Sequence, residues 1–192
     1  MLDRRELVRR LLVDRGDLLV VSGLGSATYD VAAAGDHPLN FYLWGAMGGT
    51  AMIGLGLALA QPQKRVAVLT GDGDMLMGFG SLATIGVKQP KNLAIVVLDN
   101  AHYGETGMQA SHTHSGIDLV ATALGLRQCQ AEPDHRGAAH RAPEVEVLLA
   151  VTEHANVVGG GAQSGDDQEV AGIAQQDGGD IAAIEGAVIA GE

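Results

Sequence analysis

The sequence predicts an α/β fold, an open and mainly parallel sheet with helices on both faces. Two observations predict it. Residues 65–70 and 94–98 are continuous apolar runs rich in β-branched side chains, which is typical of strands buried on both faces. Segments with helical patterns alternate with such strand-like runs along the chain, as in parallel sheets with helical crossovers. The length of 192 residues suits one domain.

Each element carries its own local signal. Residues 3–13 place Leu7, Val8 and Leu11 on one stripe among charged residues, which predicts a helix. Gly54 and Gly56 lie inside another predicted helix and cost about 1 kcal/mol each relative to Ala, so we expect a neighbouring element to pack closely there. Together these patterns predict helices at residues 3–13, 28–34, 51–60, 75–86 and 117–126, and strands at 17–21, 40–44, 65–70 and 93–98.

Charge and composition exclude several classes of function. The formal net charge of -11 argues against nucleic acid or an anionic membrane as a partner. The single cysteine, Cys129, excludes an internal disulfide framework and fits a reducing compartment. The first residues form no long apolar segment of the kind that signal peptides have. We therefore expect a cytoplasmic protein.

Oxygen-bearing side chains follow two neighbouring strands of the predicted sheet. Gly71-Asp72-Gly73-Asp74 comes directly after the strand at 65–70, and Asp99-Asn100 follows the strand at 93–98. The carboxyl ends of parallel strands meet at one edge of the sheet, where ligands bind in open α/β folds. Asp72 and Asn100 should therefore face one small space and suit a hard cation such as Mg²⁺. Gly71 and Gly73 would let the backbone approach a bulky anion.

Gly71-Asp72-Gly73, followed at a distance by Asn100, resembles the diphosphate-binding motif of thiamine diphosphate enzymes. Gly45-Ala46-Met47-Gly48 and the segment from Asn100 to Gly107 are similar to one branch of that family. This branch holds the β subunit of sulfopyruvate decarboxylase and its relative phosphonopyruvate decarboxylase. The resemblance covers residues 18–126 and implies the diphosphate-type domain of the thiamine diphosphate-binding fold.

The resemblance implies a ligand set. Mg²⁺ would be held by Asp72, Asn100 and the backbone carbonyl of His102, together with diphosphate oxygens and water. Met47 would wedge between the two rings of the cofactor and force it into a bent shape, while the Gly45 carbonyl would accept a hydrogen bond from its amino group. The cofactor-binding residues would be Gly25, Ser26, Gly45, Met47, Gly71, Asp72, Gly73, Asp74, Asn100, His102, Tyr103, Gly104 and Glu105.

Each of three features near this site has two possible interpretations. Ser26 either donates to the diphosphate or caps a helix at its N-terminus. Glu105 either contacts the loop or substrate, or is an ordinary exposed acid. His112 and His114 are spaced like ligands on a strand but have no obvious third partner. They either meet an acidic substrate headgroup or are loop histidines.

The family implies a thiamine diphosphate- and Mg²⁺-dependent decarboxylase of a small 2-oxo acid. The family's catalytic Glu lies on a separate pyrimidine-binding domain, so we expect no catalytic residue on this chain. A partner α subunit should supply that Glu in a hetero-oligomer or dimer, and the substrate stays open. Two alternatives remain. One is a nucleotide-binding module using Gly23-x-Gly25, although Thr28 stands where a third glycine belongs. The other is a non-catalytic scaffold subunit.

The resemblance ends at residue 126. Residues 127–192 hold 3 Arg and 12 acidic residues, so this segment contributes -9 of the net charge, and it lacks Lys and aromatic residues. Such composition buries a core poorly. We expect weak order there, with residues 145–151 as the one apolar run. Two interpretations stay open: a flexible acidic tail, or a sequence foreign to the family, as a shifted reading frame would produce.

Overall fold

The computed structural model describes residues 3–128 and 146–151. Helices and strands alternate through most of this part, as the sequence predicts. The helices are α1 (Arg4–Leu12), α2 (Ser26–Ala33), α3 (Thr50–Ala60), α4 (Asp72–Met77), α5 (Gly80–Lys88) and α6 (Leu119–Gln128), with a 3-10 turn at Gly104–Thr106. The strands are β1 (Leu19–Ser22), β2 (Asn40–Tyr42), β3 (Val66–Gly71), β4 (Leu93–Asp99), β5 (His102–Tyr103), β6 (Gln109–Ala110) and β7 (Glu146–Val151).

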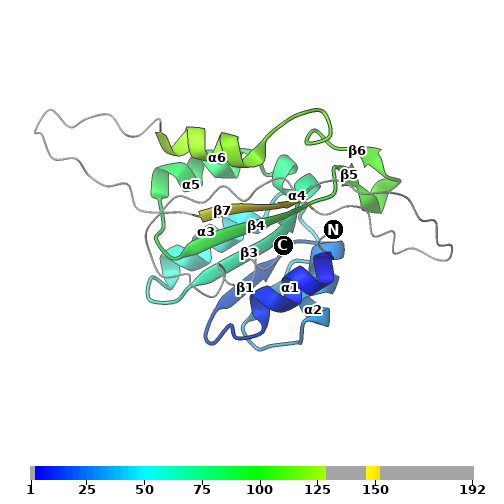
Figure 1. The fold of residues 1–192 in the computed structure, drawn as a ribbon. Helices are drawn as coiled ribbons and strands as arrows, with labels where there is room; N and C mark the ends of the chain where they lie inside the picture. Colours follow the sequence, from blue (N-terminus) through cyan, green and yellow to red (C-terminus); the bar gives the residue numbers. More distant parts are fainter. Residues whose placement is uncertain (1–2, 129–145, 152–192) are drawn as a thin grey trace, which may run out of the picture.

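Five strands form one parallel sheet in the order β2-β1-β3-β4-β7 (Figure 1). The register pairs Ser22 of β1 with Leu69 of β3, and Gly71 of β3 with Leu98 of β4. The strand order runs outward in one direction from β1 to β2 and in the other from β3 to β7. The chain therefore has a topological switch point between β1 and β3, which is where open α/β sheets bind ligands.

Both faces of the sheet are apolar. Successive side chains of a strand point to opposite faces, so neighbouring residues of one strand pack in different layers. Val21, Val68 and Ile95 pack with α3, α5 and α6, whereas Val20, Leu69 and Val96 pack with α1 and α2. All seven residues of β4 are buried. The predicted fold class, an open parallel sheet with helices on both faces, is confirmed.

The two glycines predicted to mark close packing of α3 behave differently. A Cβ on Gly54 would collide with Cγ2 of the fully buried Val68, whereas a Cβ on Gly56 meets nothing within 4 Å. Close contact with the sheet is therefore confirmed for Gly54, and contact with a partner helix stays a prediction for Gly56. The latter lies on the exposed side of the helix.

Gly54→Ala and Gly56→Ala should change stability in opposite directions. Both gain about 1 kcal/mol of helix propensity, but only the first overpacks the core, which costs about 1–3 kcal/mol. Urea unfolding of the full chain measures both variants. We expect Gly56→Ala to raise the free energy of unfolding and Gly54→Ala to fall about 1–3 kcal/mol below it. Equal values for the two variants would contradict the packing of α3 on β3.

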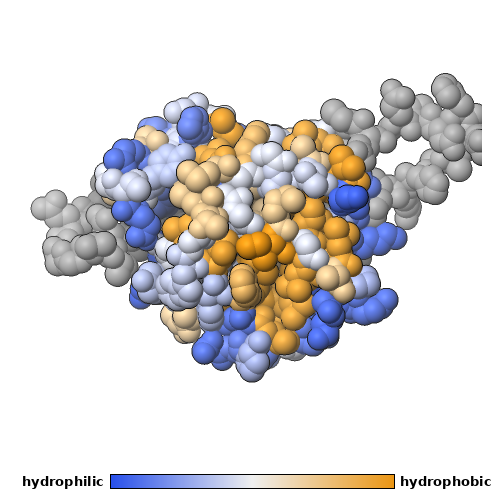
Figure 2. All heavy atoms as spheres, turned by 180° about the vertical axis from the view of Figure 1, so that it is seen from behind, coloured by the Kyte–Doolittle hydropathy of each residue, from blue (hydrophilic) through white to orange (hydrophobic). Residues whose placement is uncertain are grey.

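The outward side of α3 is apolar as well. Met52 and Leu59 are exposed on this helix, and Trp44 and Phe41 are exposed on the segment before it. Seen from behind, a band of apolar residues crosses the middle of the molecule (Figure 2). Large apolar patches on the surface of a protein often mark interaction sites. Within the described residues, no helix has the length and apolar character needed to cross a bilayer.

Two predictions about the elements need correction. The helix expected at residues 75–86 is two helices, because α4 runs from Asp72 to Met77 and ends with Gly78 as its C-cap, where the backbone of Gly48 leaves no room for a side chain. The expectation of weak order after residue 127 is wrong for 146–151. There β7 pairs in parallel with β4 from Ala94 to Asp99. The outer edge of β4 supplies the backbone hydrogen-bonding groups with which this apolar segment pairs. Residues 129–145 and 152–192 lie outside the described residues.

Candidate functional site

The predicted site residues converge on the carboxyl edge of the sheet. β3 ends at Gly71 and passes directly into α4, so Asp72, Gly73 and Asp74 form the first turn of that helix. β4 ends at Asp99, next to the end of β3 in the register of the sheet. The adjoining loop folds back as a short antiparallel hairpin of β5 and β6. This hairpin was not predicted from the sequence.

Asp72 is buried at the centre of this edge. Its side chain is 2% exposed, and its Oδ2 accepts a hydrogen bond from Ser111 Oγ at 2.5 Å. Thr113 Oγ1 donates to Asp99 Oδ1 at 2.9 Å and lies 3.4 Å from Asp72 Oδ2, so one hydroxyl bridges the two acids. Burial raises the pKa of Asp99, and the nearby Asp72 carboxylate raises it further. A bound cation would offset the repulsion between two buried carboxyl groups in contact.

Asn100 begins a tight turn at the end of β4. Its Oδ1 accepts from the backbone N–H of His102 at 3.0 Å, and its carbonyl oxygen lies 2.9 Å from His102 Nδ1. Ala101 between them has a positive φ of 60°, as do Ala46 and Met108 at 53° and 62°. Such a conformation costs an Ala residue about 1–2 kcal/mol. Among the described residues, these strained positions concentrate in the loops around the site, as is common at functional sites.

Met47, Gly73 and Tyr103 come together from three segments far apart in the sequence. A Cβ on Gly73 would lie 2.7 Å from Cδ1 of Tyr103 and 3.1 Å from Cε of Met47. The absence of a side chain at Gly73 therefore lets the side chains of Met47 and Tyr103 pack against the first turn of α4. The approach of the Gly73 backbone to a bulky anion stays a prediction.

Asp74 is one of the predicted cofactor-binding residues, and the structure gives its side chain partners of its own. The carboxylate is 5% exposed and accepts hydrogen bonds from three donors: the backbone N–H of Gly48, Thr50 Oγ1 at 2.5 Å and Thr70 Oγ1. These donors belong to the loop before α3, the first residue of α3 and the end of β3. Sequence reasoning missed Thr50 and Thr70, as well as Ser111 and Thr113.

The end of β1 completes the edge. Gly25 has φ of 71° and is the N-cap of α2, so the alternative in which Ser26 caps this helix is wrong. Ser26 is its first residue and is exposed. A Cβ on Gly25 would lie 2.9 Å from Oε1 of Glu105, so the exposed Glu105 side chain lies next to this turn, and both interpretations of it stay open. Thr28, at the place of a third glycine, is buried and donates to the Gly23 carbonyl.

The other predicted residues lie nearby with fewer contacts. A Cβ on Gly45 would meet nothing within 4 Å, and one on Gly104 would meet only the sulfur of Met108 at 3.9 Å. The His114 ring packs edge-on against the His102 ring with 5.6 Å between centroids. His112 and His114 lie in a turn, so the strand geometry considered for them is wrong. Among the described residues, no group of three His, Cys, Asp or Glu is placed to hold a metal ion.

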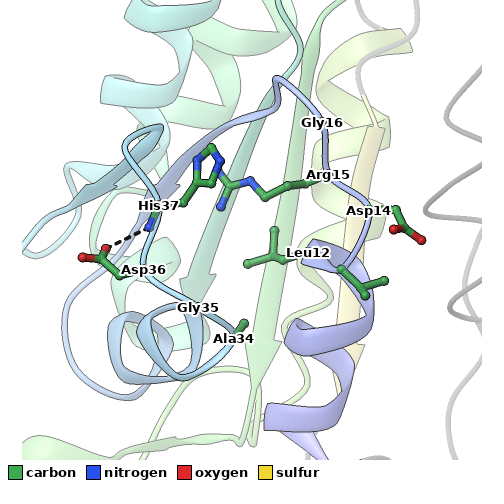
Figure 3. A pocket seen from close by; sticks show the side chains of 9 residues that line it. Leu12, Asp14, Arg15, Gly16, Ala34, Gly35, Asp36 and His37 are labelled. Carbon is green, nitrogen blue, oxygen red and sulfur yellow. Dashed lines mark hydrogen bonds between the residues drawn. The ribbon is translucent and has the colours of Figure 1, made fainter.

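A separate pocket lies away from this edge (Figure 3). It is lined by the segments 12–16 and 34–37, which precede β1 and β2 and therefore belong to the opposite edge of the sheet. Arg15 reaches across it and donates to the Leu18 carbonyl at 2.8 Å and to Asn40 Oδ1. Burial lowers the pKa of Arg15. These bonds tie the loop before β1 to β2 and give Arg15 a structural role.

Residues 23–154 match the family model described as thiamine pyrophosphate enzyme, C-terminal TPP binding domain. The chain belongs to this family. Thiamine pyrophosphate is another name for thiamine diphosphate, so the family predicted from the motif is confirmed. The match includes every residue of the edge described above and extends through β7.

Similar proteins carry decarboxylase names. The chain is 44% identical over 126 residues to the sulfopyruvate decarboxylase β subunit of Methanothermobacter thermautotrophicus, a match that covers 66% of this chain and 67% of that subunit. It is 39% identical over 123 residues to the same subunit of Methanocaldococcus jannaschii, covering 64% and 65%. It is 44% identical to the phosphonopyruvate decarboxylase of Streptomyces viridochromogenes, covering 60% of this chain but 29% of that protein.

Solved structures agree on the fold. Benzoylformate decarboxylase from Polynucleobacter necessarius superposes with a TM-score of 0.59 at 16% identity, over 79% of this chain and 33% of that one. A thiamin diphosphate-dependent enzyme from Mycobacterium smegmatis gives 0.54 at 23% identity, over 64% and 25%. The chain thus corresponds to about a quarter to a third of these larger proteins.

Proposed function

We propose that this chain is the diphosphate-binding subunit of a thiamine diphosphate- and Mg²⁺-dependent decarboxylase of a small 2-oxo acid. The observation that carries the proposal is the buried Asp72–Asp99 edge beside Asn100, in a chain of this family. The 44% identity to a sulfopyruvate decarboxylase β subunit supports the reaction class. Sulfopyruvate, phosphonopyruvate and other 2-oxo acids remain candidate substrates.

The chemistry of the donor set fits the cation. Asp72 and Asn100 offer a carboxylate and an amide oxygen, and the carbonyl of His102 is the third predicted ligand. Mg²⁺ prefers hard oxygen ligands. Its positive charge would offset the repulsion between the buried carboxyl groups of Asp72 and Asp99. The cation would also neutralise a bound diphosphate, which explains how an acidic chain can bind an anion. Bound thiamine diphosphate supplies the electron-accepting ring that lets CO₂ leave a 2-oxo acid.

The chain's own residues would position the cofactor and exclude water. Gly73 leaves space at the first turn of α4, and Met47 and Tyr103 close over that space from two sides. The backbone N–H groups of Asp74, Tyr103 and Gly104 are the proposed donors to diphosphate oxygens. Gly25 and Ser26 at the start of α2 would approach the same anion. Met47 would bend the cofactor, and the Gly45 carbonyl would orient its amino group.

The catalytic Glu is proposed to come from a partner subunit that holds the pyrimidine half of the cofactor. The similar proteins of Methanothermobacter and Methanocaldococcus are named as β subunits, which supports a hetero-oligomer. The exposed apolar side of α3, with Met52 and Leu59, is a surface that such a partner could cover. We propose that the complete site lies between chains.

Co-purification of the native complex followed by a CO₂-release assay tests this function. With sulfopyruvate or phosphonopyruvate as substrate, we expect turnover only when both thiamine diphosphate and Mg²⁺ are present. The isolated chain should bind the cofactor without turnover. Full turnover by the complex after both have been removed would contradict the proposal.

A further inference from the structure

We propose that the Asp74 side chain is a positioning residue that sets the place of the Met47 loop relative to the metal-binding edge. The inference rests on the proposed function. It assigns a task to the carboxylate, whereas the motif assigns one only to the backbone N–H. The structural basis is a buried anion that three segments share.

The contacts of Asp74 are divided between its two oxygens. Oδ1 accepts from the backbone N–H of Gly48, and Oδ2 accepts from the hydroxyls of Thr50 and Thr70. Gly48 and Thr50 flank the turn that follows Met47, while Thr70 belongs to β3. The carboxylate thus ties the loop at residues 45–50 to β3, the strand that leads into Asp72 at the start of α4.

The surroundings leave this carboxylate little freedom to move. Thr50 and Thr70 are each 1% exposed, and a Cβ on Gly23 at the end of β1 would lie 2.6 Å from Asp74 Oδ2. Hydrogen bonds to a charged acceptor are stronger than bonds between neutral groups. A buried carboxylate with three donors therefore holds its partners in one arrangement.

The other end of α4 contacts the same loop. Gly48 has φ of 90°, and its carbonyl oxygen occupies the space that a side chain on Gly78 would need. The loop at 45–50 is consequently held at both ends of one short helix, through Asp74 and through Gly78. Met47 directly precedes Gly48, which makes both of these contacts, and its Cε lies 3.1 Å from the Cβ position of Gly73. Loss of the Asp74 contact should let Met47 move while Asp72 stays in place.

This division predicts a selective effect on ligands. Magnesium pyrophosphate carries only the group that the edge of Asp72 and Asn100 is proposed to bind. Thiamine diphosphate carries in addition the rings that the Met47 loop would hold. Asp74→Ala should therefore weaken binding of thiamine diphosphate at least about tenfold, or about 1.4 kcal/mol, and leave magnesium pyrophosphate within about threefold.

The test is calorimetric titration of the complex with each of the two probes. Asp74→Asn should bind both probes nearly as the wild type does, because its Oδ1 can accept from Gly48 and its amide can donate to a threonine hydroxyl. Asp17→Asn, at an exposed position before β1, is the matched control. If Asp74→Ala does not fold, Thr50→Val removes one donor from the loop and should show the same selectivity with a smaller loss.

The outcomes separate this inference from the proposed function. A wild-type complex that binds neither probe contradicts the function and the inference together. Normal wild-type binding, with equal losses of both probes or no loss in Asp74→Ala, overturns only the role of Asp74. Selective loss of thiamine diphosphate, restored in Asp74→Asn, supports it.

Discussion

Asp72→Ala should lower the turnover of the complex at least about a hundredfold. Changes to residues around metal ligands already cost 10–100-fold in metal affinity or activity, and Asp72 is the proposed ligand itself. Its carboxylate is buried beside Asp99 and accepts a hydrogen bond from the Ser111 hydroxyl. The measurement is CO₂ release at increasing Mg²⁺ concentrations, with Asp17→Ala as the control.

The stability of the same variants separates lost metal from lost fold. Asp72→Asn keeps an acceptor for Ser111 and removes one of two neighbouring carboxylates, so without Mg²⁺ it should melt no lower than the wild type. Only the wild type should gain melting temperature when Mg²⁺ and thiamine diphosphate are added. Unchanged turnover in Asp72→Ala would instead favour the non-catalytic scaffold subunit.

Met47→Ala should lower kcat about a hundredfold while it changes cofactor affinity much less. The side chain reaches the Cβ position of Gly73 from the 45–48 loop, where it is proposed to bend the cofactor. Misplacement of a reacting group by about 1 Å can cost that much in rate. Steady-state kinetics with saturating cofactor measures kcat, and calorimetry measures affinity.

Met47→Leu is the matched variant, because it keeps the volume of the side chain and changes only its shape. It should recover most of the lost rate. A Met47→Ala complex with the wild-type kcat would show that Met47 only fills space beside Gly73 and Tyr103.

The sheet could be predicted because its strands are buried on both faces and read as unbroken apolar runs. β3 and β4 were found within a residue or two, and their order along the chain placed Asp72 and Asp99 at one edge. The motif around Gly71–Gly73 identified the family. Local signals in the sequence therefore predict where the candidate site lies.

The features that could not be predicted from the sequence depend on contacts between segments far apart along the chain. Ser111 and Thr113 bond to Asp72 across about forty positions, and neither residue has a periodicity that marks it. Glycines inside a helix predict close packing only when they face the sheet, which separates Gly54 from Gly56. The pairing of β7 with β4 was missed because the acidic composition around it outweighed a six-residue apolar run.

Titration of thiamine diphosphate into the assembled complex, once with Mg²⁺ and once with a chelator, tests the central claim most directly. The claim is that Asp72 and Asn100 hold a cation which in turn holds the diphosphate. We expect heat of binding with Mg²⁺ and an affinity at least about a hundredfold lower in the chelator. Equal affinity under both conditions would contradict the account.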